Sequence, residues 1–238
     1  MNDGKSSAVE RWWALGQVLI LLFGILAVFV IAGAIGPTAQ QIVMLLGLPL
    51  SALSAWFFMR KDGKSGPGIG LKRPDSWPRT IAIAFGAYIA IVVIMRFVLN
   101  PIISATLGSW WDPTQFDALK GNAGQWAVNV FFVAWFHAAF CEETVFRGFF
   151  FQRLEKALGG STAALVAALV LQGGLFGLAH SANGVAALVE TWIAGILIGL
   201  LFIYMRRNLW ANIITHALLD TTIFTLVFFG AQRFLLPG

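Results

Sequence analysis

Apolar residues are grouped along the chain in seven long runs that alternate with short polar connections. An α-helix rises 1.5 Å per residue, so about 20 apolar residues cross the ~30 Å hydrocarbon core of a bilayer. The seven runs, each near that length, are Ala14–Ile35, Ile42–Met59, Thr80–Leu99, Gln125–Phe140, Thr162–Ala179, Val185–Met205 and Ile213–Phe229. The fourth continues past an acidic pair, and an eighth crossing results if one run splits. The pattern predicts an all-α fold, a polytopic transmembrane helical bundle of seven or eight spans.

The composition supports the same interpretation. Of the 238 residues, 58% are hydrophobic and 11% are charged, whereas a soluble domain carries about 25% charged residues. Most of the surface must therefore face something other than water, and we expect the lipid bilayer to be its partner. Because transmembrane helices have to pack on one another, we expect one integral membrane domain, with residues 1–124 forming the N-terminal spans.

The positive charges mark the predicted cytoplasmic side. The net charge is +5, but the basic residues lie in short connections, where they orient helices, so they do not indicate nucleic-acid binding. The connection 60–79 has six basic residues against two acidic ones. By the positive-inside rule this loop is cytoplasmic, and the N-terminus with it. Arg153 and Lys156, and Arg206 with Arg207, fall on the same side. The first run is longer than the apolar region of a signal peptide, so we expect an uncleaved span.

Two acids and an arginine interrupt the fourth apolar run. A charge at the bilayer centre costs roughly 2.5–3.5 kcal/mol, so Glu142, Glu143 and Arg147 indicate function by default. Glu143 and Arg147 are four apart with the acid first, which is the favourable order for a helical ion pair. Glu142 points about 100° away on a helix of 3.6 residues per turn. We interpret one acid as structural and the other as reactive; the alternative is a charge network that only locks helices together.

Two histidines lie in the late apolar runs. His180 follows Phe176 by four residues, and Asn212, His216 and Asp220 recur every four residues and share one helix face. A single histidine in a span more often bonds a neighbouring helix than catalyses a reaction. Two histidines with a glutamate pair favour chemistry, because imidazole and carboxylate groups bind metals and accept protons from water near neutral pH.

Cys141 is the only cysteine, which excludes an internal disulfide and a cysteine-based metal cluster. His137 precedes it by four residues, so a Cys–His nucleophilic pair is geometrically conceivable. The adjacent acidic pair opposes thiolate formation, which favours a small apolar role for Cys141.

These motifs resemble those of the CPBP family of intramembrane proteases, which comprises CAAX proteases and bacteriocin-processing enzymes and is also called the Abi family. The resemblance rests on Glu142-Glu143-x-x-x-Arg147, then Phe176-x-x-x-His180, then His216 with a polar residue four positions on. It covers roughly Gln125 to Phe229, and it makes residues 125–230 the expected catalytic core.

The resemblance implies a membrane endopeptidase in which Glu142 is the general base that activates water. Glu143 and Arg147 would brace the site, while His180 and His216 would position water, the carbonyl group or a metal. The family is described both as metal-dependent and as metal-free. Glu142, His180 and His216 would form a two-histidine, one-carboxylate site for a divalent metal such as zinc.

One residue departs from the family pattern. The family usually has asparagine four residues after the last histidine, where its amide stabilises an oxyanion, and this chain has Asp220. An ionised carboxylate only accepts hydrogen bonds. Three alternatives remain: Asp220 is protonated, it orients His216 or a metal, or Asn212 supplies the donor. We favour the orienting role.

A second expectation concerns depth in the membrane. Straight upright helices would place His180 and His216 at different levels, so we expect a break at Gln172-Gly173-Gly174 or a re-entrant segment at 149–160.

The sequence therefore predicts an intramembrane endopeptidase that acts on a membrane-anchored peptide or protein, prenylated or otherwise hydrophobic. Short loops favour a multi-pass protein of a prokaryotic inner membrane. One alternative is an ion- or proton-coupled transporter, which would also bury Glu, His and Arg. The transporter should show internal repeats, whereas here the buried polar residues lie in one half of the chain. A second alternative is a non-catalytic binding or immunity protein, which would tolerate Glu142→Gln.

Overall fold

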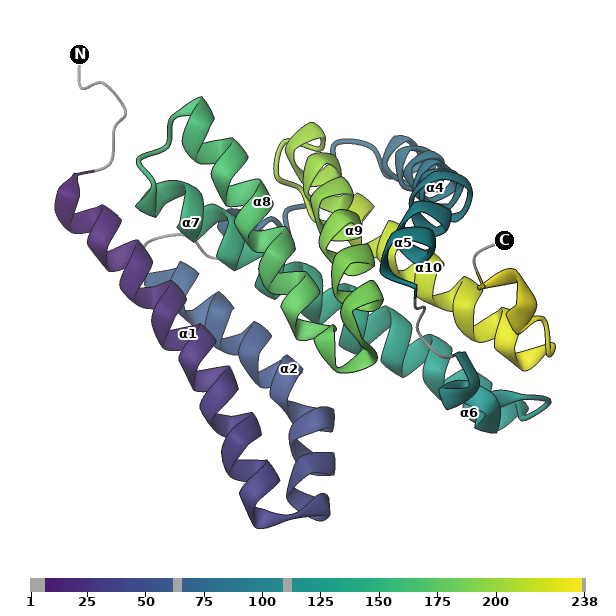
Figure 1. The fold of residues 1–238 in the computed structure, drawn as a ribbon. Helices are drawn as coiled ribbons and strands as arrows, with labels where there is room; N and C mark the ends of the chain where they lie inside the picture. The colour runs from purple at the N-terminus through teal and green to yellow at the C-terminus, as the bar shows by residue number, and fades with distance from the viewer. Residues whose placement is uncertain (1–6, 62–65, 109–112, 237–238) are drawn as a thin grey trace. The chain divides into compact units, whose positions relative to one another are not determined.

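The computed structural model describes residues 7–61, 66–108 and 113–236, and within these ranges every regular element is a helix (Figure 1). Six of these helices are long and apolar enough to cross a membrane, judged by length and composition. The predicted all-α helical bundle is therefore confirmed. Two predictions fall partly outside the described residues. They are the cytoplasmic N-terminus and, in the basic loop, residues 62–65.

The long helices follow the seven predicted apolar runs. Their bounds are α1 Ala8–Ile35, α2 Pro37–Lys61, α4 Trp77–Ile94 continued through the π-helical turn η1 Met95–Leu99 into α5 Asn100–Leu107, α8 Thr162–Ala179, α9 Val185–Tyr204 and α10 Trp210–Phe228. The fourth run becomes α6 Ala123–Val128 followed by η3 Asn129–Phe151, a π-helix of 23 residues. The short elements are α3 Gly66–Ile69, η2 Pro113–Leu119, α7 Gln152–Ala157, η4 Ser181–Asn183 and η5 Gln232–Phe234.

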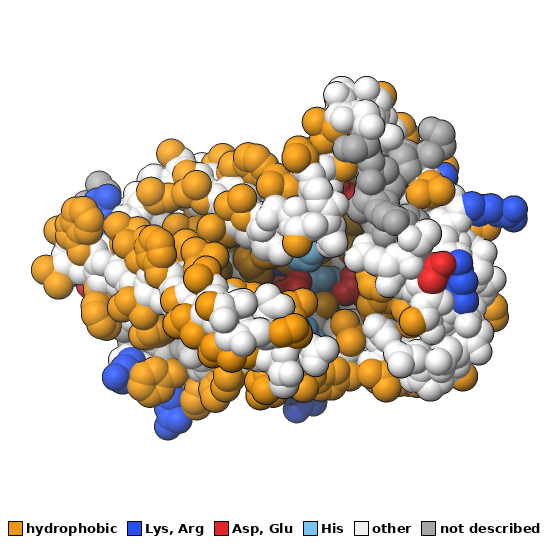
Figure 2. Space-filling view, turned by 60° about the horizontal axis from the view of Figure 1, so that its bottom comes forward, with side chains coloured by type: hydrophobic (Ala, Val, Ile, Leu, Met, Phe, Trp, Pro, Cys, Tyr) orange, Lys and Arg blue, Asp and Glu red, His pale blue; other side chains and the backbone are white. Residues whose placement is uncertain are grey.

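The surface is that of a protein surrounded by lipid. Large apolar side chains such as Val30, Phe97 and Phe131 are about 70% exposed, a degree that water would penalise. Figure 2 shows hydrophobic side chains over much of the visible face, with Lys and Arg side chains mostly toward its edges. This distribution agrees with apolar helices that turn their outer faces to the bilayer.

Of the two alternatives for the depth of the histidines, the break in the fifth apolar run does not occur, and the re-entrant segment at 149–160 stays a prediction. Helix α8 continues without interruption through Gln172, Gly173 and Gly174 to Ala179. Glycine weakens a helix by only about 1 kcal/mol, and here the glycines are used for helix packing. A Cβ added to Gly173 would lie 2.9 Å from the Ile196 side chain of α9. Gly173 therefore allows close approach of α8 and α9, and the two glycines do not end α8.

The chain forms two compact units, which we describe separately. The first comprises Met1–Arg73 and Cys141–Gln172, and the second comprises Pro74–Phe140 and Gly173–Gly238. The prediction of one integral domain with a border near residue 124 stays a prediction.

In the first unit, α1 packs against α2 and α7. Ser7 and Glu10 form a capping box at the start of α1, which satisfies backbone donors there. Arg11 Nε donates to the Ala157 carbonyl at 3.0 Å, and Lys156 Nζ lies 3.3 Å from Glu10 Oε1.

Arg153 differs from the expectation of a loop residue. Its side chain is buried in the first unit, where Nη2 lies 3.4 Å from the Phe58 carbonyl oxygen and the guanidinium lies 5.9 Å from the centre of the Phe149 ring. The apolar stem and the planar head of arginine suit such a site.

In the second unit, α4, α9 and α10 pack together. Ala84, Leu201 and Ala211, one from each helix, form a buried cluster. The Thr215 hydroxyl donates to the Ala84 carbonyl at 3.0 Å, and the Tyr88 and Thr222 hydroxyls lie 2.7 Å apart. These contacts hold α10, which carries His216, against α4.

Candidate active site

Glu143 and Arg147 form the ion pair that their spacing predicts. Arg147 Nη1 donates to Glu143 Oε1 at 2.8 Å, and both side chains are fully buried in the second half of η3. Breaking a buried pair leaves a charge without compensation, which costs about 3–5 kcal/mol. The pair therefore fixes the orientation of this part of η3.

Glu142 has a different environment from Glu143. It follows the buried thiol Cys141 and is only partly buried, whereas Glu143 and Thr144 beside it are fully buried or nearly so. Of the two adjacent acids, Glu142 is thus the more accessible one. This difference agrees with the interpretation of one structural and one reactive carboxylate.

The π-helix η3 carries this acidic motif. Over Asn129–Phe151 the backbone hydrogen bonds join residues five apart, so the helix is wound more widely than an α-helix. Such winding is uncommon, occurs mostly as single turns and is frequent at functional sites. The charged residues thus lie in an unusual backbone segment.

In the second unit, the Phe176 ring lies beside both predicted histidines. Its centre is 4.6 Å from that of His180 and 6.0 Å from that of His216, which it meets at 84°, edge to face. His180 follows the end of α8 and His216 lies in the middle of α10. The structure therefore brings His180 and His216 together, with Phe176 contacting each.

The hydrogen bond of His180 determines which ring nitrogen carries the proton. Nδ1 lies 2.8 Å from the Phe176 carbonyl oxygen. A carbonyl only accepts, so Nδ1 must donate, and in neutral imidazole Nε2 then keeps its lone pair. This arrangement prepares Nε2 of His180 to accept a proton or to bind a metal.

His216 and Asp220 lie near each other on α10. Nε2 of His216 is 3.7 Å from Oδ2 of Asp220, and Asp220 is the more exposed of the two. This distance exceeds that of a hydrogen bond. Asn212 Nδ2 donates to the Ile198 carbonyl at 2.8 Å inside the unit, so this amide ties α10 to α9. The assignment of an orienting role to Asp220 stays a prediction.

Gly177, three residues before His180, lets α8 approach α9 closely. A Cβ at Gly177 would lie 2.6 Å from the Leu188 carbonyl oxygen and 2.9 Å from Cβ of Trp192. Real Cβ atoms essentially never approach so closely, so only glycine fits. Small residues that let two helices touch are typical of membrane proteins.

Glu190 is a partly buried acid that the sequence patterns did not single out. Asn100 Nδ2 donates to Glu190 Oε1 at 3.1 Å, which links α5 to the first turns of α9. A carboxylate inside a predicted span was the available signal, because such groups are costly there. Asn100 follows the π-helical turn η1 directly.

The six predicted site residues divide between the two units. Glu142, Glu143 and Arg147 belong to the first unit, and His180, His216 and Asp220 belong to the second. Among the residues that the structure describes, no group of three or more His, Cys, Asp or Glu side chains is placed to hold a metal ion. The metal site at Glu142, His180 and His216 stays a prediction.

The six long apolar helices fit a multi-pass membrane protein. Residues 124–222 match the family model described as type II CAAX prenyl endopeptidase Rce1-like. This segment is similar to that family, which confirms the resemblance to the CAAX proteases, and it contains all six predicted site residues. No curated protein and no solved structure matches the chain.

Proposed function

We propose that the protein is an intramembrane endopeptidase in which Glu142 activates the attacking water. Its substrate would be a membrane-associated peptide or protein with a hydrophobic segment, such as a prenylated C-terminal tail. The observation that carries this proposal is the match of residues 124–222 to a CAAX endopeptidase family, with the acidic and histidine motifs inside the matched segment.

The proposed reaction is hydrolysis of one peptide bond. Glu142 takes a proton from water, and the hydroxide adds to the carbonyl carbon of the substrate. The tetrahedral intermediate then collapses, the C–N bond breaks, and the proton passes from Glu142 to the leaving amine. A carboxylate that serves as base and then as acid is a common device in hydrolysis.

The surrounding residues have supporting roles in this proposal. The buried pair of Glu143 and Arg147 holds η3 in place, so that Glu142 keeps its orientation. By the family resemblance, His180 and His216 position the attacking water, the carbonyl group or a metal.

A divalent metal such as zinc is compatible with the donor types. Two histidines and one carboxylate form a catalytic zinc set that leaves a position for water. The Nδ1–H of His180 donates to a backbone carbonyl, which is the usual support of a metal-binding imidazole. A bound metal would lower the pKa of its water and polarise the carbonyl group.

The proposal can be tested with the purified protein in lipid vesicles. Wild type and Glu142→Gln would receive a farnesylated peptide ending in a C-a-a-X sequence, and mass spectrometry would detect the released tripeptide. We expect cleavage by the wild type and at least a 10²-fold lower rate for Glu142→Gln, as for loss of a general base. Glu10→Gln, which neutralises an exposed carboxylate in the same unit, is the matched control. Equal cleavage by Glu142→Gln would contradict the mechanism.

A further inference from the structure

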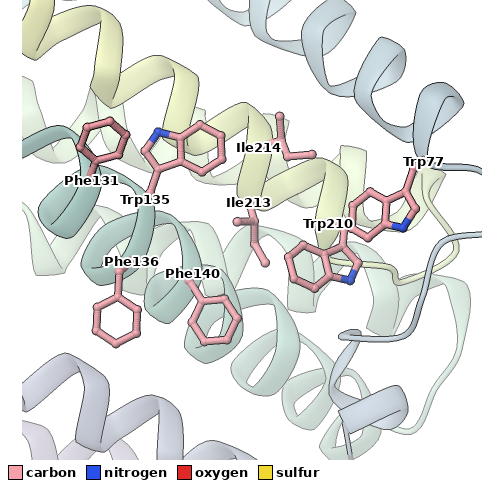
Figure 3. Close-up of a pocket in the computed structure, with 8 residues that line it drawn as sticks. All are labelled: Trp77, Phe131, Trp135, Phe136, Phe140, Trp210, Ile213 and Ile214. Carbon is pink, nitrogen blue, oxygen red and sulfur yellow. The ribbon is translucent and has the colours of Figure 1, made fainter.

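An apolar groove of about 380 Å³ opens on the second unit. Its walls come from the first half of η3, from the first turns of α10 and from the start of α4. Figure 3 shows Trp77 and Trp210 side by side at one end of the groove and Phe131 at the other. Ile213 and Phe140 lie between them. The eight lining side chains are all aromatic or aliphatic, which suits a hydrocarbon chain.

The tryptophan pair places this end of the groove near a membrane surface. Trp77 and Trp210 are the first residues of α4 and α10, and their rings meet at 5.3 Å and 60°. Tryptophan is enriched at the level of lipid headgroups, where the ring is apolar and the indole N–H stays hydrated. The groove therefore begins at the headgroup level and continues toward the interior of the bilayer.

Three arginines flank the tryptophan pair in the sequence of the same unit. Arg79 lies two residues after Trp77, and Arg206 and Arg207 lie in the turn before Trp210. Arg79 and Arg206 are exposed and Arg207 is partly buried. The nearest acid in the sequence of this part of the unit is Asp75, so positive charge is in excess there.

The turn with the two arginines has an unusual backbone. Arg206 and Arg207 have φ values of 51° and 62°, the left-handed region that favours glycine. The turn is nevertheless well bonded, since Arg207 N–H donates to the Phe202 carbonyl at 2.8 Å and Trp210 N–H donates to Asn208 Oδ1 at 3.0 Å. Two consecutive arginines thus occupy positions that glycine would adopt with less strain, and they precede Trp210 by four and three residues.

We propose that this end of the second unit is a binding site for an anionic phospholipid. One acyl chain lies in the groove, and the phosphate is held by Arg79, Arg206 and Arg207. Arginine binds phosphate oxygens with two parallel hydrogen bonds, which gives geometry as well as charge. A zwitterionic phospholipid has the same acyl chains but no net negative charge. The arginines would therefore favour the anionic phospholipid over the zwitterionic one. The site is independent of the proposed proteolysis.

The test measures lipid retention by native mass spectrometry. The wild type would be reconstituted with equal amounts of phosphatidylglycerol and phosphatidylcholine that have the same acyl chains. We expect one retained phosphatidylglycerol and a preference for it of roughly tenfold or more, because each basic residue near a membrane surface contributes appreciably to binding anionic lipid. Arg206→Gln with Arg207→Gln should remove most of this preference.

Two further variants separate lipid binding from folding. Arg206→Gly with Arg207→Gly removes the charges, and glycine adopts positive φ without strain. Arg79→Gln changes an exposed side chain outside the turn and should lower the preference by a smaller factor. Arg233→Gln is the matched control, because Arg233 is exposed in the same unit beyond the far end of α10.

The outcomes are distinct. Loss of the preference in the turn variants, with unchanged thermal unfolding and a normal Arg233→Gln control, would support the site. Equal retention of both lipids by the wild type would mean ordinary annular contact and would overturn the proposal. A preference that survives in Arg206→Gly with Arg207→Gly and in Arg79→Gln would also overturn it.

Discussion

The acidic motif of the first unit and the histidine motif of the second are stabilised in different ways. Glu143 and Arg147 are fully buried and joined at 2.8 Å, so each neutralises the other within an apolar helix. His216 is buried and lies 3.7 Å from the partly exposed Asp220, and His180 is oriented by a backbone carbonyl and the Phe176 ring. The first region depends on charge pairing, and the second depends on packing.

This difference indicates where stability and activity should separate. A substitution in the buried pair leaves a charge in a low dielectric, where it is costly. A substitution at Asp220 changes a side chain that is partly exposed to solvent. Substitutions in the acidic motif should therefore mainly lower the free energy of unfolding. Substitutions in the histidine motif should mainly shift the side chains of the site and so change activity.

The largest loss of stability is expected for Arg147→Met. This change removes the partner of the buried Glu143 and should destabilise the protein by about 3–5 kcal/mol. Thermal unfolding in detergent measures the effect, with Arg233→Met, at an exposed arginine, as the control. Adding Glu143→Leu to Arg147→Met should recover part of the loss, because both charges are then absent. If Arg147→Met were as stable as Arg233→Met, Glu143 and Arg147 would not be a stabilising buried ion pair.

A somewhat smaller effect is expected for Gly177→Ala. The added methyl group would clash with the Leu188 carbonyl of α9, which typically costs about 1–3 kcal/mol. Activity should fall as well, because His180 lies three residues beyond and its backbone N–H donates to the Gly177 carbonyl at 3.0 Å. Gly86→Ala is the control, since a Cβ there meets nothing within 4 Å. Similar melting temperatures and rates for the two variants would argue against close packing of α8 on α9.

A moderate loss is expected for Glu190→Leu. Asn100 Nδ2 would lose the carboxylate that accepts its hydrogen bond, and a buried amide without that acceptor costs about 1–3 kcal/mol. Glu190→Gln keeps an acceptor oxygen in the same place and should remain close to the wild type. Comparison of the two melting temperatures isolates the hydrogen bond from the charge. If Glu190→Gln is the more damaging variant, the charge of Glu190 is required and the hydrogen bond is secondary.

The smallest effect is expected for Asp220→Asn. Since the side chain lies 3.7 Å from His216 and is not tightly paired with it, the change should alter kcat/KM by less than about tenfold, or ~1.4 kcal/mol. Peptide cleavage in vesicles provides the measurement. A loss as large as that of Glu142→Gln would show that Asp220 acts directly on the substrate.

The helices were predictable because their signal is local. The bounds of α8 agree with the apolar run Thr162–Ala179, and the pair of Glu143 and Arg147 follows from spacing along one helix. The contact of Phe176 with both histidines depends on residues 40 positions apart in the sequence, which no local pattern encodes. The expected break at Gln172–Gly174 was wrong because glycine serves equally for bending and for close packing, and only the neighbouring helix decides between them.

The hydrogen bond between Asn100 and Glu190 was not predicted for a similar reason. Glu190 was visible as an acid in an apolar run, but its partner Asn100 lies 90 residues earlier. The π-helical winding of η3 and η1 also has no sequence signature that hydrophobic periodicity detects.

The measurement that tests the central proposal most directly compares peptide termini in cells that produce the wild type or Glu142→Gln at equal levels. It requires no assumption about the substrate. The proposal predicts new termini, adjacent to hydrophobic or lipid-modified segments, that are present with the wild type and with Glu10→Gln and absent with Glu142→Gln. Identical sets of termini in all three strains, under conditions where the protein affects growth or survival, would contradict proteolysis and favour a transport or binding function.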